Sequence, residues 1–95
     1  MILGYVEEGQ DLVVVAMNGG GEGHPAWWTN LRHDPRATVA LAGGERRRVR
    51  ARRAAGAERE RLWARWRDVD ASIDAHAAAR STPTPVVVLA PDPDA

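Results

Sequence analysis

Two short apolar runs constrain the fold of this chain more than any other feature. Residues 12–15 read LVVV and residues 86–89 read VVVL, so both runs are contiguous and mostly β-branched. Runs of this length and composition predict buried β-strands over Asp11–Ala16 and Val86–Leu89, because a buried helix needs a longer segment. With 95 residues the chain has room for one small domain, which we place at residues 1–91, with a disordered tail at 92–95.

The remaining segments alternate between strand and helix patterns. A glycine pair at 43–44 separates two strand-like runs and predicts a second hairpin. In chain order we expect strands at Ile2–Val6 and Asp11–Ala16, a short helix at Ala26–Arg32, strands at Arg36–Ala42 and Glu45–Ala54, a long helix at Ala57–Asp70 whose pattern extends through Ala71–Arg80, and a strand at Val86–Leu89. Antiparallel hairpins with one main covering helix predict an α+β fold, a small and partly closed antiparallel β-barrel.

The long helix carries an apolar stripe. Its members are spaced four, three and four residues apart, at Leu62, Trp66, Val69 and Ile73. This spacing marks one helix face, which we expect to pack on the sheet together with Trp63. Prolines at 83 and 85 then end the helical pattern.

Residues 17–31, MNGGGEGHPAWWTNL, form the most unusual segment of the sequence. Its four glycines permit positive φ and close approach of the backbone to another group, and Trp27 and Trp28 add two large flat rings. Since adjacent residues of a regular element face different ways, we expect one Trp in the core and the other free for stacking. The segment lacks the lysine and the GK[ST] ending of a phosphate-binding P-loop. From the residues alone, a structural turn and a ligand-binding loop both remain open.

Composition and spacing exclude several classes of site. The chain has no cysteine, which rules out disulfides, thiolate metal sites and cysteine nucleophiles. His24, His33 and His76 lack metal-ligand spacing, so we expect no metal site. His24 is interpreted as a turn residue that hydrogen-bonds its own backbone. No apolar run reaches the about 18 residues of a membrane span and no signal peptide opens the chain, so a cytoplasmic location is expected.

An arginine-rich run stands between Arg46 and Arg53, where six of the thirteen arginines fall. A nucleic-acid patch is one interpretation. The net charge of the chain is zero, however, and no aromatic residue interleaves with the arginines. We therefore expect a solvated strand face that pairs with acidic neighbours, and no nucleic-acid partner.

Four motifs follow one another along the chain: LVVVAMNGG, then HPAWWTNLRHDPRATV, then ERERLWAR, then PTPVVVLAP. Their order resembles the deazaflavin (F420)-dependent nitroreductase family, and the resemblance runs from about Leu3 to Pro91. That family has a split β-barrel fold related to the flavin proteins of the pyridoxamine-phosphate-oxidase (PNPOx) type. The resemblance implies binding of coenzyme F420, with FMN as the alternative, and hydride transfer to a small organic acceptor such as a quinone or nitro compound.

The resemblance also implies site residues, although no catalytic side chain. The implied cofactor-binding residues are Ala16, Met17, Asn18, Gly19, Gly20 and Trp27. Weaker candidates for the substrate pocket are His24, Asp70, Ile73 and His76, the last three at positions where the family usually has tyrosines. Met17 replaces a usual serine, and the basic stretch that precedes the first hairpin in the family has no counterpart in this sequence. These departures leave open a catalytically degenerate barrel that acts as an oligomeric ligand- or partner-binding module, and open barrel edges predict a homodimer.

Overall fold

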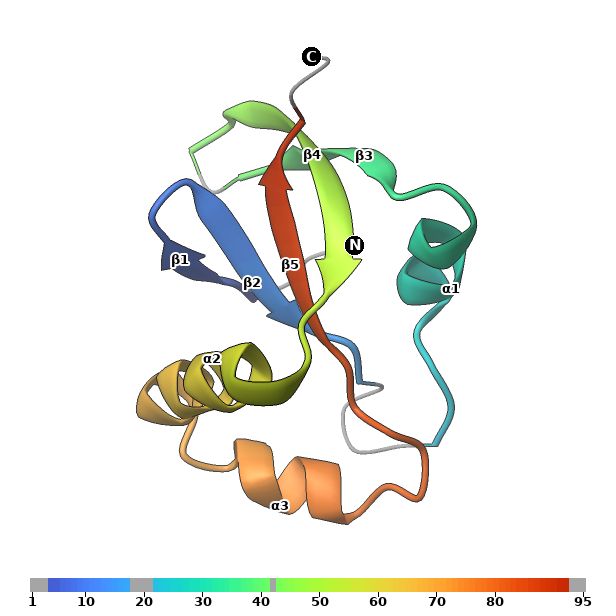
Figure 1. The fold of residues 1–95 in the computed structure, drawn as a ribbon, viewed down its shortest axis with the longest axis vertical. Helices are drawn as coiled ribbons and strands as arrows, with labels where there is room; N and C mark the ends of the chain where they lie inside the picture. Colours follow the sequence, from blue (N-terminus) through green and yellow to red (C-terminus); the bar gives the residue numbers. More distant parts are fainter. Residues whose placement is uncertain (1–3, 18–21, 42, 93–95) are drawn as a thin grey trace.

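The chain folds into one antiparallel sheet with helices packed against it (Figure 1). Our computed structural model describes residues 4–17, 22–41 and 43–92. Within these residues five strands lie in the order β1-β2-β5-β4-β3. The elements are β1 (Val6–Glu8), β2 (Asp11–Val15), α1 (Ala26–His33), β3 (Arg36–Ala40), β4 (Arg46–Arg53), α2 (Gly56–Val69), α3 (Ile73–Ala78) and β5 (Val86–Pro91). The α+β class predicted from the sequence is confirmed.

The last strand in the chain, β5, is the middle strand of the sheet. It pairs antiparallel with β2, where Val88 lies opposite Val13, and with β4, where Leu89 lies opposite Ala51. Residues 86–89 are buried on both faces of the sheet. A strand covered on both faces needs a continuous apolar run rather than an alternating one, and this requirement accounts for the sequence VVVL.

Two local hairpins supply the other strands. Val6 lies opposite Val13 in the β1–β2 hairpin, and Ala37 lies opposite Val49 in the β3–β4 hairpin. Gly9 turns the first hairpin with a φ of 62°, a conformation that costs other residue types roughly 1–2 kcal/mol. Among the described residues β1 and β3 are the edge strands, so the barrel stays open between them.

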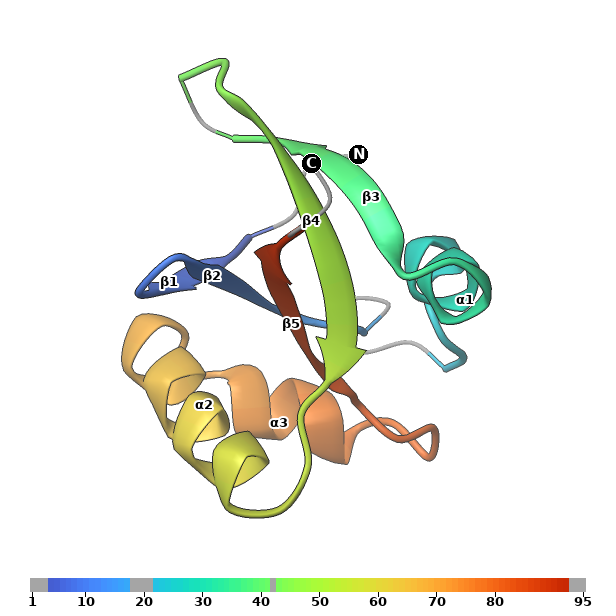
Figure 2. The ribbon, with the colours of Figure 1, turned by 45° about the horizontal axis from the view of Figure 1, so that its top comes forward.

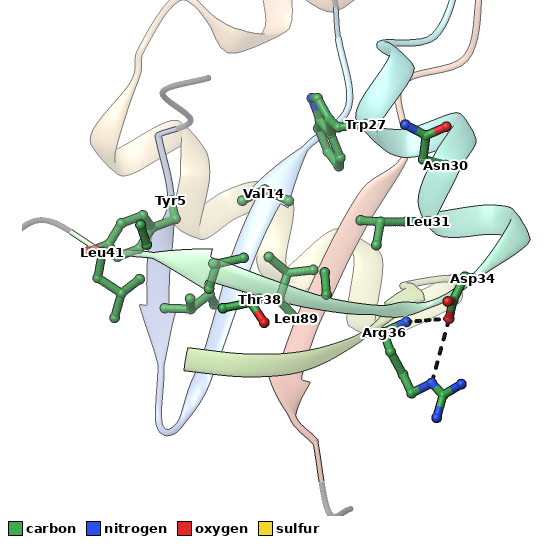
Figure 3. A pocket seen from close by; sticks show the side chains of 14 residues that line it. Tyr5, Val14, Trp27, Asn30, Leu31, Asp34, Arg36, Thr38, Leu41 and Leu89 are labelled. Atoms are coloured by element: carbon green, nitrogen blue, oxygen red, sulfur yellow. Dashed lines mark hydrogen bonds and ion pairs between the residues drawn. The ribbon is translucent and has the colours of Figure 1, made fainter. Parts of the chain in front are cut away.

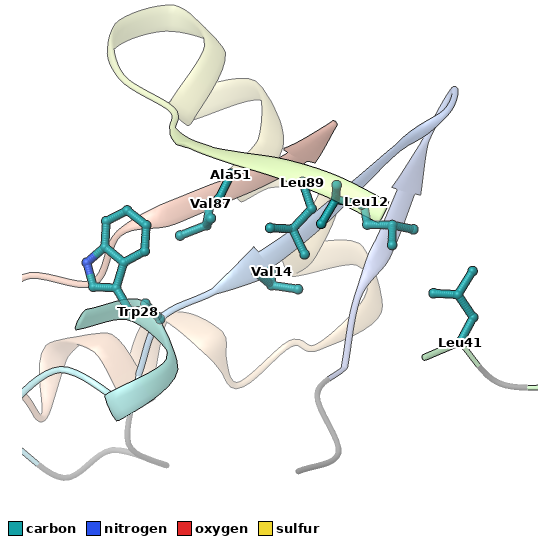
Figure 4. Close-up of a cluster of buried hydrophobic side chains, with 9 residues drawn as sticks. Leu12, Val14, Trp28, Leu41, Ala51, Val87 and Leu89 are labelled. Carbon is teal, nitrogen blue, oxygen red and sulfur yellow. The ribbon is translucent and has the colours of Figure 1, made fainter. Parts of the chain in front are cut away.

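The two faces of the sheet bury separate hydrophobic clusters because successive side chains of a strand point to opposite sides. The cavity-side cluster, shown in Figure 4, consists of Leu12, Val14, Ala16, Trp28, Leu41, Val49, Ala51, Val87 and Leu89. The α2-side cluster consists of Val6, Val13, Ala54, Leu62, Val86 and Val88. In Figure 2 the helices α2 and α3 lie together below β2 and β5, whereas α1 lies beside β3.

The predicted stripe on the long helix is correct at one end and wrong at the other. Leu62 is buried, and the partly buried Trp66 donates its indole N–H to the Val13 carbonyl at 3.2 Å. Trp63 is also only partly buried, so neither Trp is the full core residue expected. Val69 is 69% exposed, because α2 ends there and the chain turns before α3 begins. Ile73 reaches the core from α3 instead.

Several predicted boundaries also differ, most clearly at the first and last strands. Among the described residues the first strand is Val6–Glu8, because the turn uses residues 9 and 10 and leaves Glu7 and Glu8 to pair with β2. Of the strand predicted at Ile2–Val6, residues 2 and 3 lie outside the described residues and residues 4 and 5 are not in a strand. The last strand continues to Pro91, and the Asp92 N–H donates to the Arg48 carbonyl at 3.1 Å. Residues 93–95 of the expected tail lie outside the described residues, and the extent of the domain stays a prediction.

Candidate functional site

A cavity of about 490 Å³ opens between α1, β3 and the inner face of the sheet (Figure 3). Its floor is built by Leu12 and Val14 of β2 and Leu89 of β5. These side chains belong to the cavity-side cluster, so the floor is apolar and held by the central strands. The volume falls within the roughly 300–1,000 Å³ that small-molecule sites occupy.

The walls of the cavity come from β3, α1 and the residue before β1. Figure 3 places Tyr5 and Leu41 at one end of the cavity and Trp27 and Asn30 at the other. Along β3 the residues 37, 39 and 41 read Ala, Val and Leu and are more buried than their neighbours. This period-two pattern turns the apolar side of an edge strand toward the cavity.

The two adjacent tryptophans of α1 point into different surroundings. Trp27 is half-buried and lines the cavity, whereas Trp28 is 5% exposed and belongs to the cavity-side cluster. Their ring centroids lie 6.5 Å apart with an interplanar angle of 67°, an edge-to-face arrangement. The expectation that one Trp belongs to the core is confirmed for Trp28, and stacking of a ligand on Trp27 stays a prediction.

Polar groups in the cavity wall are few and concentrate at the α1–β3 corner. Asp34, the C-cap of α1, accepts the Arg36 backbone N–H at 3.2 Å and lies 3.6 Å from the Arg36 Nε. Both side chains are more than half exposed, so this pair stabilises little. Asn30 adds a neutral hydrogen-bonding group. The arrangement suits a flat, mostly apolar ring that carries polar atoms on one edge.

The residues that the sequence implied for cofactor binding are only partly placed. Trp27 lines the cavity. Ala16 is buried in the cavity-side cluster and donates its backbone N–H to the Pro85 carbonyl at 2.9 Å, while Met17 is half-buried and follows it. Neither of these two is among the described residues that line the cavity. Asn18, Gly19 and Gly20 lie outside the described residues, so the cofactor assignment of this segment stays a prediction.

The expected hydrogen bond between His24 and its own backbone is not formed at Nδ1. The residue is half-buried, and this ring nitrogen is buried without a hydrogen-bond partner among the described residues. Instead, the neighbouring residues Glu22 and Gly23 form hydrogen bonds to a distant segment, residues 81–82.

The three residues at the family's tyrosine positions lie in the α2–α3 connection and in α3. Asp70 accepts hydrogen bonds from the Ser72 hydroxyl at 2.6 Å and from its backbone N–H at 3.0 Å, which lowers the pKa of the Asp70 carboxyl. Ile73 is buried and His76 is exposed. None of the three is among the described residues that line the cavity beside Trp27.

The arginine-rich strand behaves partly as predicted. Arg52 donates to both carboxylate oxygens of Glu58 at 2.5 and 2.8 Å, and Arg47 lies 3.7 Å from Glu45. Val49 and Ala51, which lie between these arginines in the sequence, are buried in the cavity-side cluster.

Within the described residues no group of three His, Cys, Asp or Glu side chains could hold a metal ion. The helices of the described residues also include none that is both long and apolar enough to cross a membrane.

Comparison with known proteins decides what kind of molecule carries this cavity. Residues 2–91 match the profile of the F420H(2)-dependent quinone reductase family. The chain belongs to this family. A family relative from Mycobacterium tuberculosis, named as an F420H(2)-dependent quinone reductase, is 34% identical over 87 residues, which cover 92% of this chain and 72% of that protein.

Solved structures agree with the family assignment. An F420-H2 dependent reductase aligns with a TM-score of 0.78 and 26% identity, over 90% of this chain and 75% of that chain. A second structure, described as a domain-swapped dimer, aligns with a TM-score of 0.74 and 24% identity. This chain covers 63% of that second chain, and at this identity the likeness concerns the fold.

Membership confirms the resemblance read from the sequence motifs. A deazaflavin-dependent oxidoreductase function and coenzyme F420 are supported by the family profile, the mycobacterial relative and the solved reductase. The FMN alternative finds no support among them. Apart from Trp27, sequence reasoning missed the residues that line the cavity, among them Tyr5 and the row Ala37, Val39 and Leu41. The alternation in RATVAL was the signal that could have identified the row.

Proposed function

We propose that this family member holds the ring of coenzyme F420 in the cavity beside Trp27 and reduces a quinone-like acceptor there. The observation that carries the proposal is the apolar cavity, lined at one end by an aromatic side chain from the helix that follows the glycine-rich segment. A flat ring system needs apolar walls on its faces and a few polar groups at its edge. Both are present at this cavity.

The residues fit the cofactor in chemical type. Leu12, Val14 and Leu89 offer an apolar floor, Trp27 offers an aromatic face, and Asn30 offers both a donor and an acceptor. Coenzyme F420, when bound in its reduced form, supplies the hydride for the reaction. The task of the protein is to bind and orient the two reactants and to exclude water from the space between them.

The proposal also covers residues outside the cavity wall. Ala16 and Met17 lead directly into the segment 18–20, and we infer that the backbone of this segment contacts the cofactor, as the family motif suggests. His24 borders the same segment. Asp70, Ile73 and His76 would meet an acceptor only on the α2 side of the sheet, so they rank last.

We further propose a homodimer and a cytoplasmic location. Within the part of the chain that the structure describes, β1 and β3 are edge strands, and edges of this kind favour pairing with a second chain. One solved relative of the same fold is described as a domain-swapped dimer. Size-exclusion chromatography with light scattering tests the dimer, which is refuted by a monomer mass of 10.3 kDa at micromolar concentration. Fractionation of cells that express the tagged chain tests the location.

The decisive experiment measures binding and turnover separately. F420 is titrated into the protein while tryptophan fluorescence is followed, for the wild type and for the variants Trp27→Phe and Trp63→Phe. Because Trp63 lies on the α2 side, quenching should fall in the first variant and persist in the second. Turnover is then assayed with F420H2 and a soluble quinone. Saturable binding without turnover would favour the alternative function, a binding module without catalysis.

A further inference from the structure

Helix α1 carries the aromatic wall of the cavity, yet its own N-terminus lacks the usual local stabilisation. The N-cap is Pro25, which forms no side-chain capping hydrogen bond, and the first turn contains no acidic residue. A helix of eight residues without a cap is marginal by itself. Something outside the helix must therefore fix the direction in which α1 starts.

A network of hydrogen bonds joins residues 22–23, just before α1, to residues 80–83, just before β5. The Gly23 N–H donates to the Thr82 hydroxyl oxygen at 2.9 Å. The Glu22 carboxylate accepts the Ser81 N–H at 2.7 Å and the Thr82 N–H at 3.3 Å. These two amide bonds lower the pKa of Glu22. The segments are nearly sixty residues apart in the chain, so this contact is wholly tertiary.

Arg80 lies at the centre of this network. Its side chain is buried, with the residue 7% exposed, although it carries a full positive charge. The Nη2 group donates to the Gly23 carbonyl at 3.0 Å and to the Pro83 carbonyl at 3.2 Å, while the Nη1 group is buried without a partner among the described residues. Burial of a charge in this way is costly, which indicates that the position serves more than packing.

We propose that Glu22, Arg80 and Thr82 form a clamp that positions α1, and through it Trp27, against the cavity. None of the three is among the described residues that line the cavity, so they are positioning residues. The clamp joins the start of α1 to the entry of the central strand β5, which also supplies Leu89 to the cavity floor. The aromatic wall and the floor are thereby held in one frame. The consequence for F420 binding rests on the proposed function, whereas the placement of Trp27 does not.

The test compares clamp variants with a matched surface control. Thr82→Val removes the hydroxyl that accepts the Gly23 N–H with little change of side-chain shape. Arg80→Met removes the buried guanidinium group that donates to the Gly23 and Pro83 carbonyls. Arg67→Met is the control. It removes the same charge as Arg80→Met, but Arg67 pairs with Asp74 on the surface near α3 and is not part of the clamp. The first measurement is the indole N–H resonance of each of the four tryptophans in a ¹H–¹⁵N spectrum of the whole chain, recorded without cofactor.

We expect both clamp variants to shift the Trp27 resonance and to leave Trp63 and Trp66 in place, because these two lie on α2. The control should leave Trp27 unchanged. The second measurement is F420 affinity, which should fall about tenfold in Arg80→Met, equivalent to about 1.4 kcal/mol, and less than twofold in the control.

If the three clamp residues only stabilise the fold as a whole, a variant should alter all four indole resonances together. If they do not position α1, it should alter none of them. Either result in Thr82→Val overturns the proposal, and this variant decides the matter if Arg80→Met does not fold. If the wild type fails to bind F420, the proposed function fails, but the Trp27 resonance still decides whether the clamp positions α1.

Discussion

Trp28 and Trp27 are adjacent residues of the same type, and the structure predicts opposite consequences for removing them. Trp28→Ala empties a site in the cavity-side cluster where the side chain is 5% exposed. Truncating a buried Trp costs about 3–5 kcal/mol, out of about 5–15 kcal/mol of total stability for a domain. At about 4–8 °C per kcal/mol for a chain of this size, even the lower cost should reduce the melting temperature by about 12–24 °C.

Trp27→Ala should affect binding instead. The side chain is half-buried and borders the cavity, so its truncation leaves less of a void in the packed core. An aromatic stacking contact with a flat ring is worth about 1–3 kcal/mol, and 1.4 kcal/mol corresponds to about a tenfold change in affinity. We therefore expect F420 affinity to fall at least about fivefold while the melting temperature falls by less than half as much as in Trp28→Ala.

Thermal unfolding followed by circular dichroism measures the first quantity. Titration followed by the fluorescence of the cofactor itself measures the second, because it does not depend on the tryptophans. Equal losses of stability in the two variants would refute the reasoning, since α1 would then not divide its aromatic residues between core and cavity. Unchanged F420 affinity in Trp27→Ala would remove this residue from the proposed site.

Three further predictions concern the frame around the cavity. Leu62→Ala should cost about 2–5 kcal/mol in the free energy of unfolding, whereas Val69→Ala, at a side chain 69% exposed, should change it by less than about 0.5 kcal/mol; urea denaturation compares them. Gly9→Ala should destabilise by roughly 1–2 kcal/mol through its positive φ alone, since no atom lies within 4 Å of the new methyl group; thermal unfolding measures this. The hydrogen bonds that Arg67 donates lower the pKa of the Asp74 carboxyl from 3.8 to about 2. The stability that the ionised Asp74 contributes should therefore be present above the unfolded pKa of about 3.8 and be lost as the pH falls toward 2. An Asp74→Asn variant should lack this acid-dependent loss of stability.

Local sequence patterns predicted the elements because the tertiary environment agreed with them. The run VVVL identified a strand covered on both sides, and the glycine pair at 43–44 identified the β3–β4 turn. The apolar spacing of the long helix gave a wrong prediction at the C-terminal end of α2, where no residue pattern marked the end of the helix. Val69 continues the apolar spacing of α2, but the chain turns at Asp70, whose carboxylate binds the Ser72 backbone N–H and favours a turn over another helical residue.

The cavity was harder to predict than the sheet. Trp27 could be named from its motif, but nothing local distinguishes it from Trp28, because burial depends on which side of α1 meets the sheet. Tyr5 and Leu41 meet at one end of the cavity only after the sheet has brought β1 and β3 around β2, β5 and β4. Arg80 gave no signal at all, since its partners are carbonyls that any sequence would provide.

The position of β5 also governs when the protein can fold during synthesis. Both hairpins precede it in the chain, and neither contacts the other through a strand pair until β5 enters between β2 and β4. Residues 86–91 must therefore leave the ribosome before the sheet can close. Until then the apolar faces of both hairpins are exposed, so a chain truncated before Val86 would aggregate rather than yield a smaller native domain.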